Sequence, residues 1–586
     1  MSVLLRTSLG PALRIVLDFM SPGRRRQFIG LLVLMAVGGL AEIVAIASVL
    51  PFIALVAGQE LPPELLWVRR IMGGGAGTSQ TVEVARAAAM FAGFAILAGA
   101  VRLLLAWVTQ SFVFRFGHEL SVEVQRRILL QPYSFHLERN SAQVLAASEK
   151  VDTLSVGILL QLMNGTTSAF IALFIIAMLV QIDVTTALIA AAGFGGLYLV
   201  VTLLTARRLD DNSVAAAHAH DQRFKTVQEG LGGIRDVIID SSQDLFLATY
   251  SRVDRRFNDA RASTLFIGSA PRAIIESGAL VLVALLAVLL WNREGSIGPA
   301  LPILGGMAIG AFRLLPMLQQ LFYSWTIIAG NRAAAEQVLE FLDLPSDTPR
   351  AAEVVDPLPF VDAIKFEDVS FCYSTARSPA IRNASITIAA GSRVALVGKT
   401  GAGKTTFADL LVGLLNPTAG KITVDGTSIK GLERRWQRNI AHVPQAIFLA
   451  DADIARNIAF TTSDDAIDRQ KLARAIRIAQ LEAFIDELPD GLATTIGERG
   501  IRLSGGQRQR LGIARAVYKE ASVLILDEAT NALDEETEAA VMSALFEESD
   551  QRRTIIVISH RPSAIAACNL ILRVGAGQVI AAEAVA

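Results

Sequence analysis

Long apolar stretches fill the first 340 residues of the chain, and each is near the roughly 20 residues that a helix needs to cross a bilayer. They lie at about 31–57, 87–112, 156–180, 184–206, 268–291 and 299–325. These stretches predict six membrane-spanning helices, which place both ends of the region on the same side of the membrane. The connections at 113–155 and 207–263 are long and compatible with helix, so we expect those helices to continue well beyond the membrane.

Composition divides the chain at the same place. Of the 586 residues, 52% are hydrophobic and 19% are charged, and the mean hydropathy is +0.46, which is too apolar for an ordinary soluble protein. The charged fraction is about 15% in residues 1–340 and about 24% in residues 341–586, close to the average of soluble proteins. The sequence therefore predicts a membrane half followed by a water-soluble half.

Basic residues in the connections predict the orientation. The segments 1–29, 113–155 and 207–263 hold 19 Lys and Arg, whereas the opposite connections hold 3. By the positive-inside rule, both termini and the soluble half lie in the cytoplasm. The two cysteines, Cys372 and Cys568, fall in the soluble half and give no disulfide framework, which fits that location. A net charge of −1 gives no indication of nucleic acid as a partner.

Four charged residues lie inside the predicted spans, where an unpaired charge costs several kcal/mol. They are Glu42, Arg102, Glu276 and Arg313. We expect them to face inward, and two interpretations stay open. The first is structural pairing of Glu with Arg between helices. The second is that Arg102 or Arg313 contacts an anionic substrate in a central cavity, because guanidinium can bind phosphate oxygens through two hydrogen bonds.

A glycine-rich loop follows the apolar strand at 394–397 in the soluble half. The loop and the start of the next helix consist of Gly398, Lys399, Thr400, Gly401, Ala402, Gly403, Lys404, Thr405 and Thr406. This is the G-x-x-x-x-G-K-[ST] spacing in its strand–loop–helix context. Backbone N–H groups of such a loop surround phosphates, Lys404 reaches the β and γ oxygens, and Thr405 offers its hydroxyl to Mg²⁺. The motif predicts a nucleotide site in an α/β domain.

A second buried strand, SVLILDE at 522–528, ends in two carboxylates. Asp527 is suited to the Mg²⁺ shell, and Glu528 to polarising the attacking water. The segment LSGGQ at 503–507 lies between the two motifs, and NALD at 531–534 and ISHR at 558–561 follow them. This ordered set resembles the ATPase domain of ABC transporters, over about residues 363–580.

The resemblance implies roles for further residues of the ATP site. Tyr373 would stack on adenine, since an aromatic face suits a base. Gln445 would contact Mg²⁺ and the attacking water with a neutral amide. His560 would hold the γ-phosphate of ATP and orient the water. Pro562, which follows this motif, stands where leucine is more usual, and proline is tolerated in a first helical turn.

The segment at 503–507 implies a dimer. By the resemblance, it would contact the ATP held by a second subunit, and Asp534 would link the two sites. The residues concerned are Ser504, Gly505, Gly506 and Gln507. Since the chain carries one ATPase domain, the partner is expected to be a second copy, and the homodimer would bind two ATP with Mg²⁺.

Six spans fused ahead of the ATPase resemble a type I exporter half-transporter of the bacterial inner membrane. The expected architecture is an all-α six-helix transmembrane domain at 1–342, a linker at 343–362 and an α/β P-loop NTPase domain at 363–586. The segment TTIGERG at 494–500 resembles an exporter-specific loop that touches the membrane domain. Coupling helices resting on the ATPase domain are expected at 133–139 and 241–250.

Shorter patches at 41–52, 131–141 and 312–316 resemble bacterial lipid-linked oligosaccharide flippases and related glycolipid or polysaccharide exporters, rather than multidrug or lipid A exporters. This implies ATP-driven flipping of an amphipathic lipid-linked substrate among membrane lipids, with the four intramembrane charges as candidate contacts. Two alternatives stay open. One is an exporter of drugs, lipid A-like lipids or peptides. The other is an ATP-gated channel or sensor, which the intact Glu528 disfavours.

Overall fold

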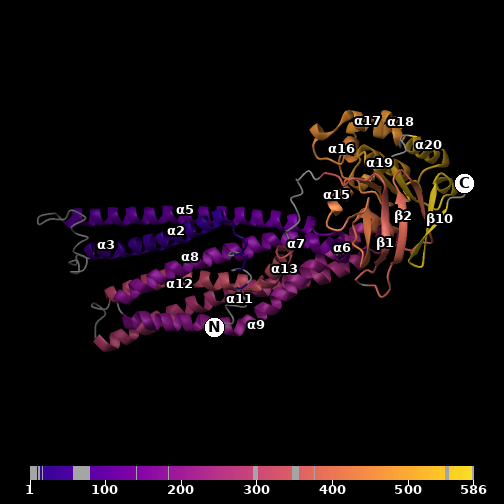
Figure 1. Ribbon diagram of the computed structural model, residues 1–586. Coiled ribbons are helices and arrows are strands. Elements are labelled where there is room, and N and C mark those ends of the chain that lie inside the picture. Colours follow the sequence, from indigo (N-terminus) through magenta and orange to yellow (C-terminus); the bar gives the residue numbers. More distant parts are fainter. Residues whose placement is uncertain are drawn as a thin grey trace. The chain divides into compact units, whose positions relative to one another are not determined.

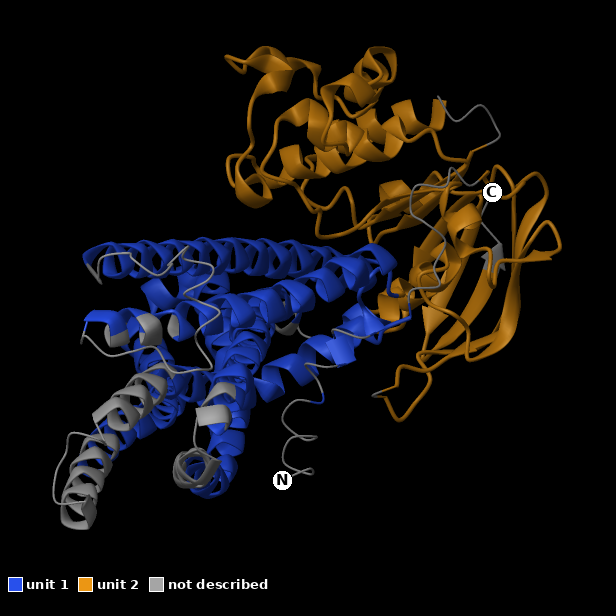
Figure 2. Ribbon diagram, turned by 90° about the vertical axis from the view of Figure 1, so that its left-hand side faces the viewer, with its two compact units in different colours: residues 1–131, 135–348 blue, residues 132–134, 349–586 orange. Residues whose placement is uncertain are grey.

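The computed structural model describes the chain apart from residues 1–9, 11–13, 16–17, 57–79, 140, 183, 295–300, 346–355, 375, 548–552 and 584–586. The chain forms two compact units (Figure 2): residues 1–131 with 135–348, and residues 132–134 with 349–586. The first unit is helical, and the second holds the β-sheets.

The helices that contain the predicted spans build most of the first unit (Figure 1). They are α2 Pro22–Ala47, α3 Val49–Val56, α5 Gln80–Leu129, α8 Leu160–Ile182, α9 Val184–Gly232, α11 Gln243–Glu294 and α12 Leu301–Gly330. The helices α5, α9 and α11 have 50, 49 and 52 residues. At about 1.5 Å per residue each is roughly 75 Å long, whereas the apolar core of a bilayer is about 30 Å thick. The expectation that these helices continue beyond the membrane is therefore confirmed.

The predicted spans fall within these helices, with two corrections. The stretch 156–180 begins in the π-helical segment η2 Ser155–Leu159, which precedes α8. The stretch 31–57 is not one helix, because α2 ends before Ser48 and α3 begins after it. The Ser48 hydroxyl donates to the Ala45 carbonyl at 2.7 Å, a local bond that competes with regular helix. Residues 57, 299 and 300 lie outside the described residues. Among the described residues, three helical stretches are long and apolar enough to cross a membrane: Pro22–Ala45, Thr81–Leu129 and Val144–Ala177.

Shorter helices complete the first unit. They are α6 Tyr133–Glu138, α7 Ser141–Leu154, α10 Ile234–Ile239, α13 Arg332–Leu342 and the π-helical segment η2 Ser155–Leu159. The expected coupling segment at 133–139 contains α6. The one at 241–250 covers the turn after α10, where Ser241 has a left-handed φ of 51°, and the first residues of α11. Their contact with the ATPase domain stays a prediction.

A buried cation joins three of these helices. Lys150 of α7 is 4% exposed, and its ammonium donates to the Asp221 carboxylate of α9 and, at 2.6 Å, to Oε1 of Gln337 in α13. Gln337 also donates to Asp221 at 3.2 Å. Because each polar group in this cluster has a partner, the charge can be buried between the helices.

Two sheets form the frame of the second unit. An antiparallel sheet has the order β2-β1-β4-β5, and a six-stranded sheet has the order β10-β9-β3-β8-β7-β6, parallel except for β10. The strands are β1 Ala363–Phe371, β2 Ile381–Ala389, β3 Arg393–Val397, β4 Ala419–Val424, β5 Thr427–Ser428, β6 Ile440–Val443, β7 Val523–Asp527, β8 Thr554–Ile558, β9 Leu570–Gly575 and β10 Gln578–Glu583. Strands β7 and β8 are buried along their whole length, which explains their continuous apolar sequence.

Helices pack in the hydrophobic cores on both faces of the six-stranded sheet, and the antiparallel sheet shares one of these cores. The helices are α14 Lys404–Val412, α15 Glu433–Gln437, α16 Ile454–Ala459, α17 Arg469–Ile478, α18 Glu482–Asp486, α19 Gly505–Tyr518, α20 Glu535–Glu547 and α21 Pro562–Ala566, with 3₁₀ turns at Asp464–Ala466, Gly491–Ala493 and Glu498–Gly500. The helical transmembrane domain followed by an α/β P-loop domain is thus confirmed. Pro562 occupies the first turn of α21, as its tolerance there predicts.

Candidate functional site

The carboxyl ends of four parallel strands bring the predicted motifs to one edge of the six-stranded sheet. The strands lie in the order β3-β8-β7-β6. The phosphate loop follows β3, His560 follows β8, Asp527 ends β7, and Gln445 follows β6. Ligands of α/β sheets bind outside the carboxyl ends of the strands. Motifs that are far apart in the sequence therefore meet at one site.

The phosphate loop needs glycine at two positions for steric reasons. A Cβ on Gly398 would lie 2.3 Å from the Val574 carbonyl oxygen. Gly403 has a φ of +107°, and a Cβ there would lie 2.9 Å from the Ala380 oxygen. The loop then leads into α14 at Lys404, so that the N-terminus of this helix faces the site. Such a terminus favours anions.

The Lys404 ammonium lies within the phosphate loop. It donates to the Gly398 carbonyl at 2.7 Å and the Lys399 carbonyl at 3.2 Å, and it lies 3.4 Å from Nε2 of His560. The Lys404 residue is only 9% exposed, whereas the His560 side chain is 53% exposed. A buried cation beside an accessible imidazole forms a site for a phosphate group.

Two side-chain amides hold one oxygen of Glu528. Nε2 of Gln445 donates to its Oε2 at 2.8 Å, and Nδ2 of Asn531 donates to the same atom at 2.9 Å. The other oxygen, Oε1, lies 3.9 Å from Nε2 of His560. Glu528 has a left-handed φ of 49°, which costs a non-glycine residue about 1–2 kcal/mol. This arrangement leaves Oε1 as the oxygen that can accept a proton from water.

Two further carboxylates are buried, Asp527 beside Glu528 and Asp409 near Asp527. Burial and the Glu528 carboxylate raise the pKa of Asp527, against an opposing effect of Lys404. Burial and the Asp527 carboxylate raise the pKa of Asp409, in α14, to about 6. The concentration of negative charge favours a cation. Asp527, the Gln445 amide and the Thr405 hydroxyl carry oxygen donors, the type that Mg²⁺ requires, and their binding of Mg²⁺ stays a prediction.

The LSGGQ segment forms the N-terminus of α19. The Ser504 hydroxyl accepts from the Gln507 N–H at 3.2 Å, and the Ser504 N–H donates to Oε1 of Gln507 at 2.8 Å, which is a capping box. A Cβ on Gly505 would lie 3.3 Å from the Ala532 Cβ, and a Cβ on Gly506 would lie 3.1 Å from the Ala532 oxygen. The glycines thus allow this helix end to approach the turn after Glu528. Contact with the ATP of a second subunit stays a prediction.

Tyr373 and Asp534 occupy positions at the margins of the site. The Tyr373 hydroxyl lies 3.1 Å from Oγ1 of Thr406, at the start of α14, and its ring packs edge-on against Phe371. Asp534 accepts from the Thr537 N–H at 3.0 Å and so caps α20, and this bond lowers the pKa of Asp534. The adenine-stacking role of Tyr373 and the linking role of Asp534 stay predictions.

Sequence reasoning did not assign Gln509, Asn531 or Asp409. Gln509 of α19 donates to the Glu528 carbonyl at 3.3 Å and accepts from the Ala532 N–H at 2.8 Å, so it joins the LSGGQ helix to the catalytic turn. These contacts depend on tertiary packing and have no local pattern. Asp409 does carry a signal, since it is the single carboxylate in the apolar run of α14.

The structure shows pairing between helices for two of the four charged residues in the predicted spans. Arg102 of α5 donates through Nη2 to Oε1 and Oε2 of Glu42 in α2, at 2.7 and 2.6 Å. Pairing between helices is thus confirmed for these two. It is wrong for Glu276, whose carboxylate accepts at 2.9 Å from Arg272, four residues earlier on the same helix. Both side chains are exposed in the single chain, and the inward position expected for Glu276 stays a prediction. Arg313 lies in α12, but its side chain lies outside the part that the structure describes.

The fold and this site define a P-loop ATPase fused to a helical membrane domain. A family model described as "ABC transporter" matches residues 381–531, and one described as "ABC transporter transmembrane region" matches residues 52–308. The chain belongs to the ABC transporter family: it binds ATP and couples ATP hydrolysis to transport across a membrane.

Named relatives agree with this assignment, and a solved structure shares the fold. An ATP-dependent lipid A-core flippase of Haemophilus influenzae is 30% identical over 503 residues, 83% of each chain. One of Photobacterium profundum is 38% identical over 337 residues, 56% of each chain. A β-(1→2)glucan export ATP-binding/permease protein of Rhizobium meliloti is 28% identical over 518 residues, 86% of this chain and 85% of that protein. A bacterial Atm1-family ABC exporter with ATP bound shares the fold, with a TM-score of 0.76, 24% identity and 95% of each chain covered.

Proposed function

We propose that two copies of this chain flip a glycolipid across the bacterial inner membrane, using Mg²⁺-ATP bound to cytoplasmic ATPase domains. The observation that supports hydrolysis is the arrangement of Glu528, whose Oε2 accepts two amide hydrogen bonds while Oε1 stays available near His560. A site that only bound ATP would not need a fixed carboxylate beside the γ-phosphate position.

The homodimer rests on the exposed LSGGQ end of α19. Ser504 is accessible to solvent at this helix N-terminus, which can bind a phosphate group of a second nucleotide. With Lys404, Ser504 and Glu528 on one chain, each of two identical chains supplies half of each site. Mg²⁺ would be held by Thr405, Gln445 and Asp527, and it would neutralise phosphate charge there.

Binding energy would drive the conformational cycle. A ligand shifts a two-state equilibrium only by its difference in affinity for the two states. ATP that bridges two ATPase domains favours their closed arrangement, and hydrolysis removes this preference. The substrate would then bind in the inward-facing state and leave from the outward-facing one.

The substrate is proposed to be a lipid with a sugar-containing headgroup, and a lipid-linked oligosaccharide is our first choice. The relatives are named for lipid A-core and for β-(1→2)glucan, so both point to carbohydrate-bearing cargo. A lipid A-like substrate fits these names at least as well and is kept as the second candidate.

Translocation in proteoliposomes tests the proposal. The purified protein is reconstituted with a polyprenyl pyrophosphate oligosaccharide, with a phosphorylated acyl diglucosamine lipid, or with the drug daunorubicin. We expect ATP-dependent movement of one of the two glycolipids and none of the drug. Movement of the drug alone would refute the proposed substrate class.

A further inference from the structure

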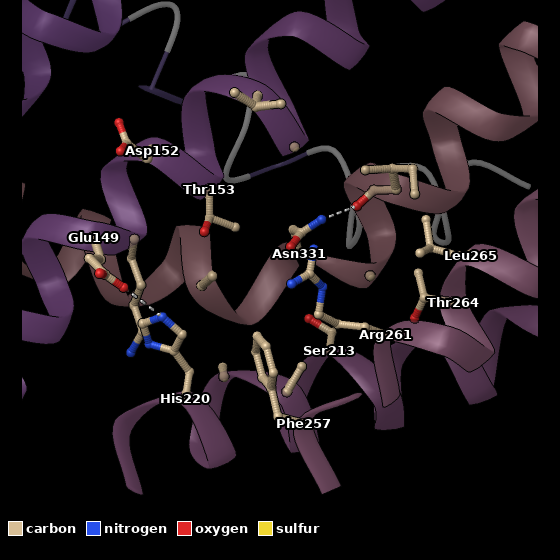
Figure 3. Close-up of a pocket in the computed structure, with 18 of the residues that line it drawn as sticks. Glu149, Asp152, Thr153, Ser213, His220, Phe257, Arg261, Thr264, Leu265 and Asn331 are labelled. Atoms are coloured by element: carbon tan, nitrogen blue, oxygen red, sulfur yellow. Dashed lines mark hydrogen bonds and ion pairs between the residues drawn. The ribbon is translucent and has the colours of Figure 1, made fainter. Parts of the chain in front are cut away.

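A polar cavity of roughly 570 Å³ opens among the helices of the first unit, whereas the ATP-site residues belong to the second unit. Its walls come from α7, η2, the start of α8, α9, α11 and the junction of α12 with α13 (Figure 3). All of these helix segments lie near or beyond the cytosolic ends of the predicted spans. The π-helical segment η2 contributes Val156 and Gly157 to the wall. π-Helical turns are rare and are frequent at functional sites.

The charged groups of this cavity differ in how they are partnered. Lys150 is neutralised by Asp221, and Arg223 forms an ion pair with Asp254, with Nε 3.1 Å from Oδ1. Arg261 is exposed and packs over the Phe257 ring, with 5.3 Å between Cζ and the ring centroid. Within the described residues, Arg261 has no carboxylate partner. Its guanidinium is therefore the cavity's available site for an anion.

Acceptors lie on the opposite side of the cavity. Figure 3 shows Glu149 and Asp152 on one side, and Arg261 and Asn331 on the other. Glu149 Oε2 lies 3.4 Å from Nε2 of His220, and burial lowers the pKa of His220, so the ring is neutral at pH 7. Carboxylates accept hydrogen bonds from hydroxyl groups. The two sides together suit a phosphate attached to a hydroxyl-rich group.

A second, apolar cavity of about 500 Å³ adjoins the first at Gln161, which lines both. It lies among α8, α9 and α12, within the predicted spans, on the membrane side of the polar cavity. Its lining includes Leu199, Leu203, Phe322 and Trp325. The hydroxyls of Thr166 and Thr202 in its wall donate to carbonyls of their own helices, so they add little polarity.

We infer that these adjoining cavities form the site where a phosphorylated glycolipid is taken from the cytoplasmic leaflet. The phosphate binds Arg261, sugar hydroxyls face Glu149 and Asp152, and a hydrocarbon chain fills the apolar cavity. The inference deepens the proposed function and rests on it. The order of the cavities matches a lipid of the inner leaflet, with its headgroup towards the cytoplasm and its chain towards the membrane interior. It also assigns the anion contact to Arg261, because Arg102 is occupied by Glu42.

Binding of matched lipids to the full-length protein tests the headgroup contact. The probes are a polyprenyl pyrophosphate disaccharide, a phosphorylated acyl diglucosamine lipid, and the same disaccharide on a phosphate-free alkyl chain. Loss of a hydrogen bond to a charged group corresponds to about a tenfold or greater loss of affinity. We expect Arg261→Gln to weaken binding of a phosphorylated probe about tenfold and to leave the phosphate-free probe unchanged. The phosphorylated probe that loses affinity identifies the source of the phosphate.

A control and a second variant separate binding from misfolding. Arg208→Gln removes an exposed arginine of α9 that does not line the cavity, and we expect wild-type binding of all probes. Leu199→Trp fills the apolar cavity and should weaken the long-chain lipids more than water-soluble glucosamine 1-phosphate. A general loss of affinity for every probe in both cavity variants would contradict the two-part site.

Different binding results would refute the inference alone or the inference together with the proposed function. If the wild-type protein binds the phosphorylated glycolipid and Arg261→Gln binds it equally well, the inference is wrong and the proposed function stands. If the wild-type protein binds none of the glycolipids, the substrate class and the inference both fail.

Protection of Val156→Cys, but not Val122→Cys, from maleimide by the bound lipid would support the location of the site, and equal labelling of both would contradict it. Both positions are exposed, and Val156 alone lines the cavity.

Discussion

Gln445 donates a hydrogen bond of 2.8 Å to Oε2 of Glu528, and Asn531 donates one of 2.9 Å to the same oxygen. One carboxylate oxygen is thereby fixed by two amides from different segments. The other oxygen faces His560 at 3.9 Å. The carboxylate is thus oriented before any substrate binds, and Asn531 acts as a positioning residue for it.

Replacing Asn531 tests this orientation. We expect Asn531→Ala to lower the kcat of ATP hydrolysis about five- to tenfold with little change in KM, because one hydrogen bond of about 1–1.5 kcal/mol to Oε2 is lost. Steady-state ATPase assays on the reconstituted protein measure both constants. Ser543→Ala, which removes an exposed hydroxyl of α20 bonded to Glu547, is the control. A rise in KM at unchanged kcat would show that Asn531 serves nucleotide binding instead.

Gly398 is predicted to tolerate no side chain. A Cβ would lie 2.3 Å from the Val574 oxygen, so the backbone of β9 or of the loop must shift. We expect Gly398→Ala to destabilise the ATPase domain by about 2–3 kcal/mol, measured by thermal unfolding without nucleotide. Gly575 is the matched control, because a Cβ there meets no atom within 4 Å. Equal melting temperatures for the two variants would contradict the steric argument.

Asp409 is predicted to make stability depend on pH. Burial and Asp527 raise its pKa from 3.8 to about 6. Between these values the folded state binds more protons than the unfolded state, so stability falls as pH rises through this range. Asp409→Asn removes the effect and should be more stable relative to wild type at pH 7 than at pH 4.5, by about 1–2 kcal/mol. Thermal unfolding at the two pH values measures this, and a constant difference between the proteins would refute it.

The ion pair of Lys150 and Asp221 is predicted to stabilise the bundle only as a pair. Lys150→Met leaves the Asp221 carboxylate half-buried with Gln337 as its remaining partner. We expect a loss of about 2–3 kcal/mol in unfolding free energy. The double variant Lys150→Met with Asp221→Leu should recover most of it. If the double variant is less stable than the single one, the charge is not the cause.

The residues that could be assigned from the sequence are those whose role depends on local spacing. The phosphate loop needs a strand, glycines and a helix start in one stretch of chain, and the apolar spans need only length. The hydrogen bonds of Asn531 and Gln509 depend on the turn after Glu528, which brings α19 against it, and no periodic pattern encodes that contact.

The partners of the charged residues in the membrane half could not be assigned from the sequence either. The pairing of Glu42 with Arg102 was one of two interpretations, and choosing between them required the neighbour relation of α2 and α5. The pairing of Glu276 with Arg272, four residues earlier on the same helix, likewise needed side-chain positions to recognise. The cavity beside Arg261 combines several separate helix segments between residues 149 and 334, so it has no counterpart in any single stretch of sequence.

ATP-dependent movement of the phosphorylated glycolipids by wild-type protein and by Glu528→Gln tests the central claim most directly. A general base contributes about 10²- to 10⁴-fold to a reaction rate. We therefore predict that Glu528→Gln binds ATP but loses both hydrolysis and repeated translocation by at least about a hundredfold in proteoliposomes. Repeated translocation at the wild-type rate by this variant would contradict an ATP-hydrolysing flippase and would support an ATP-gated pathway.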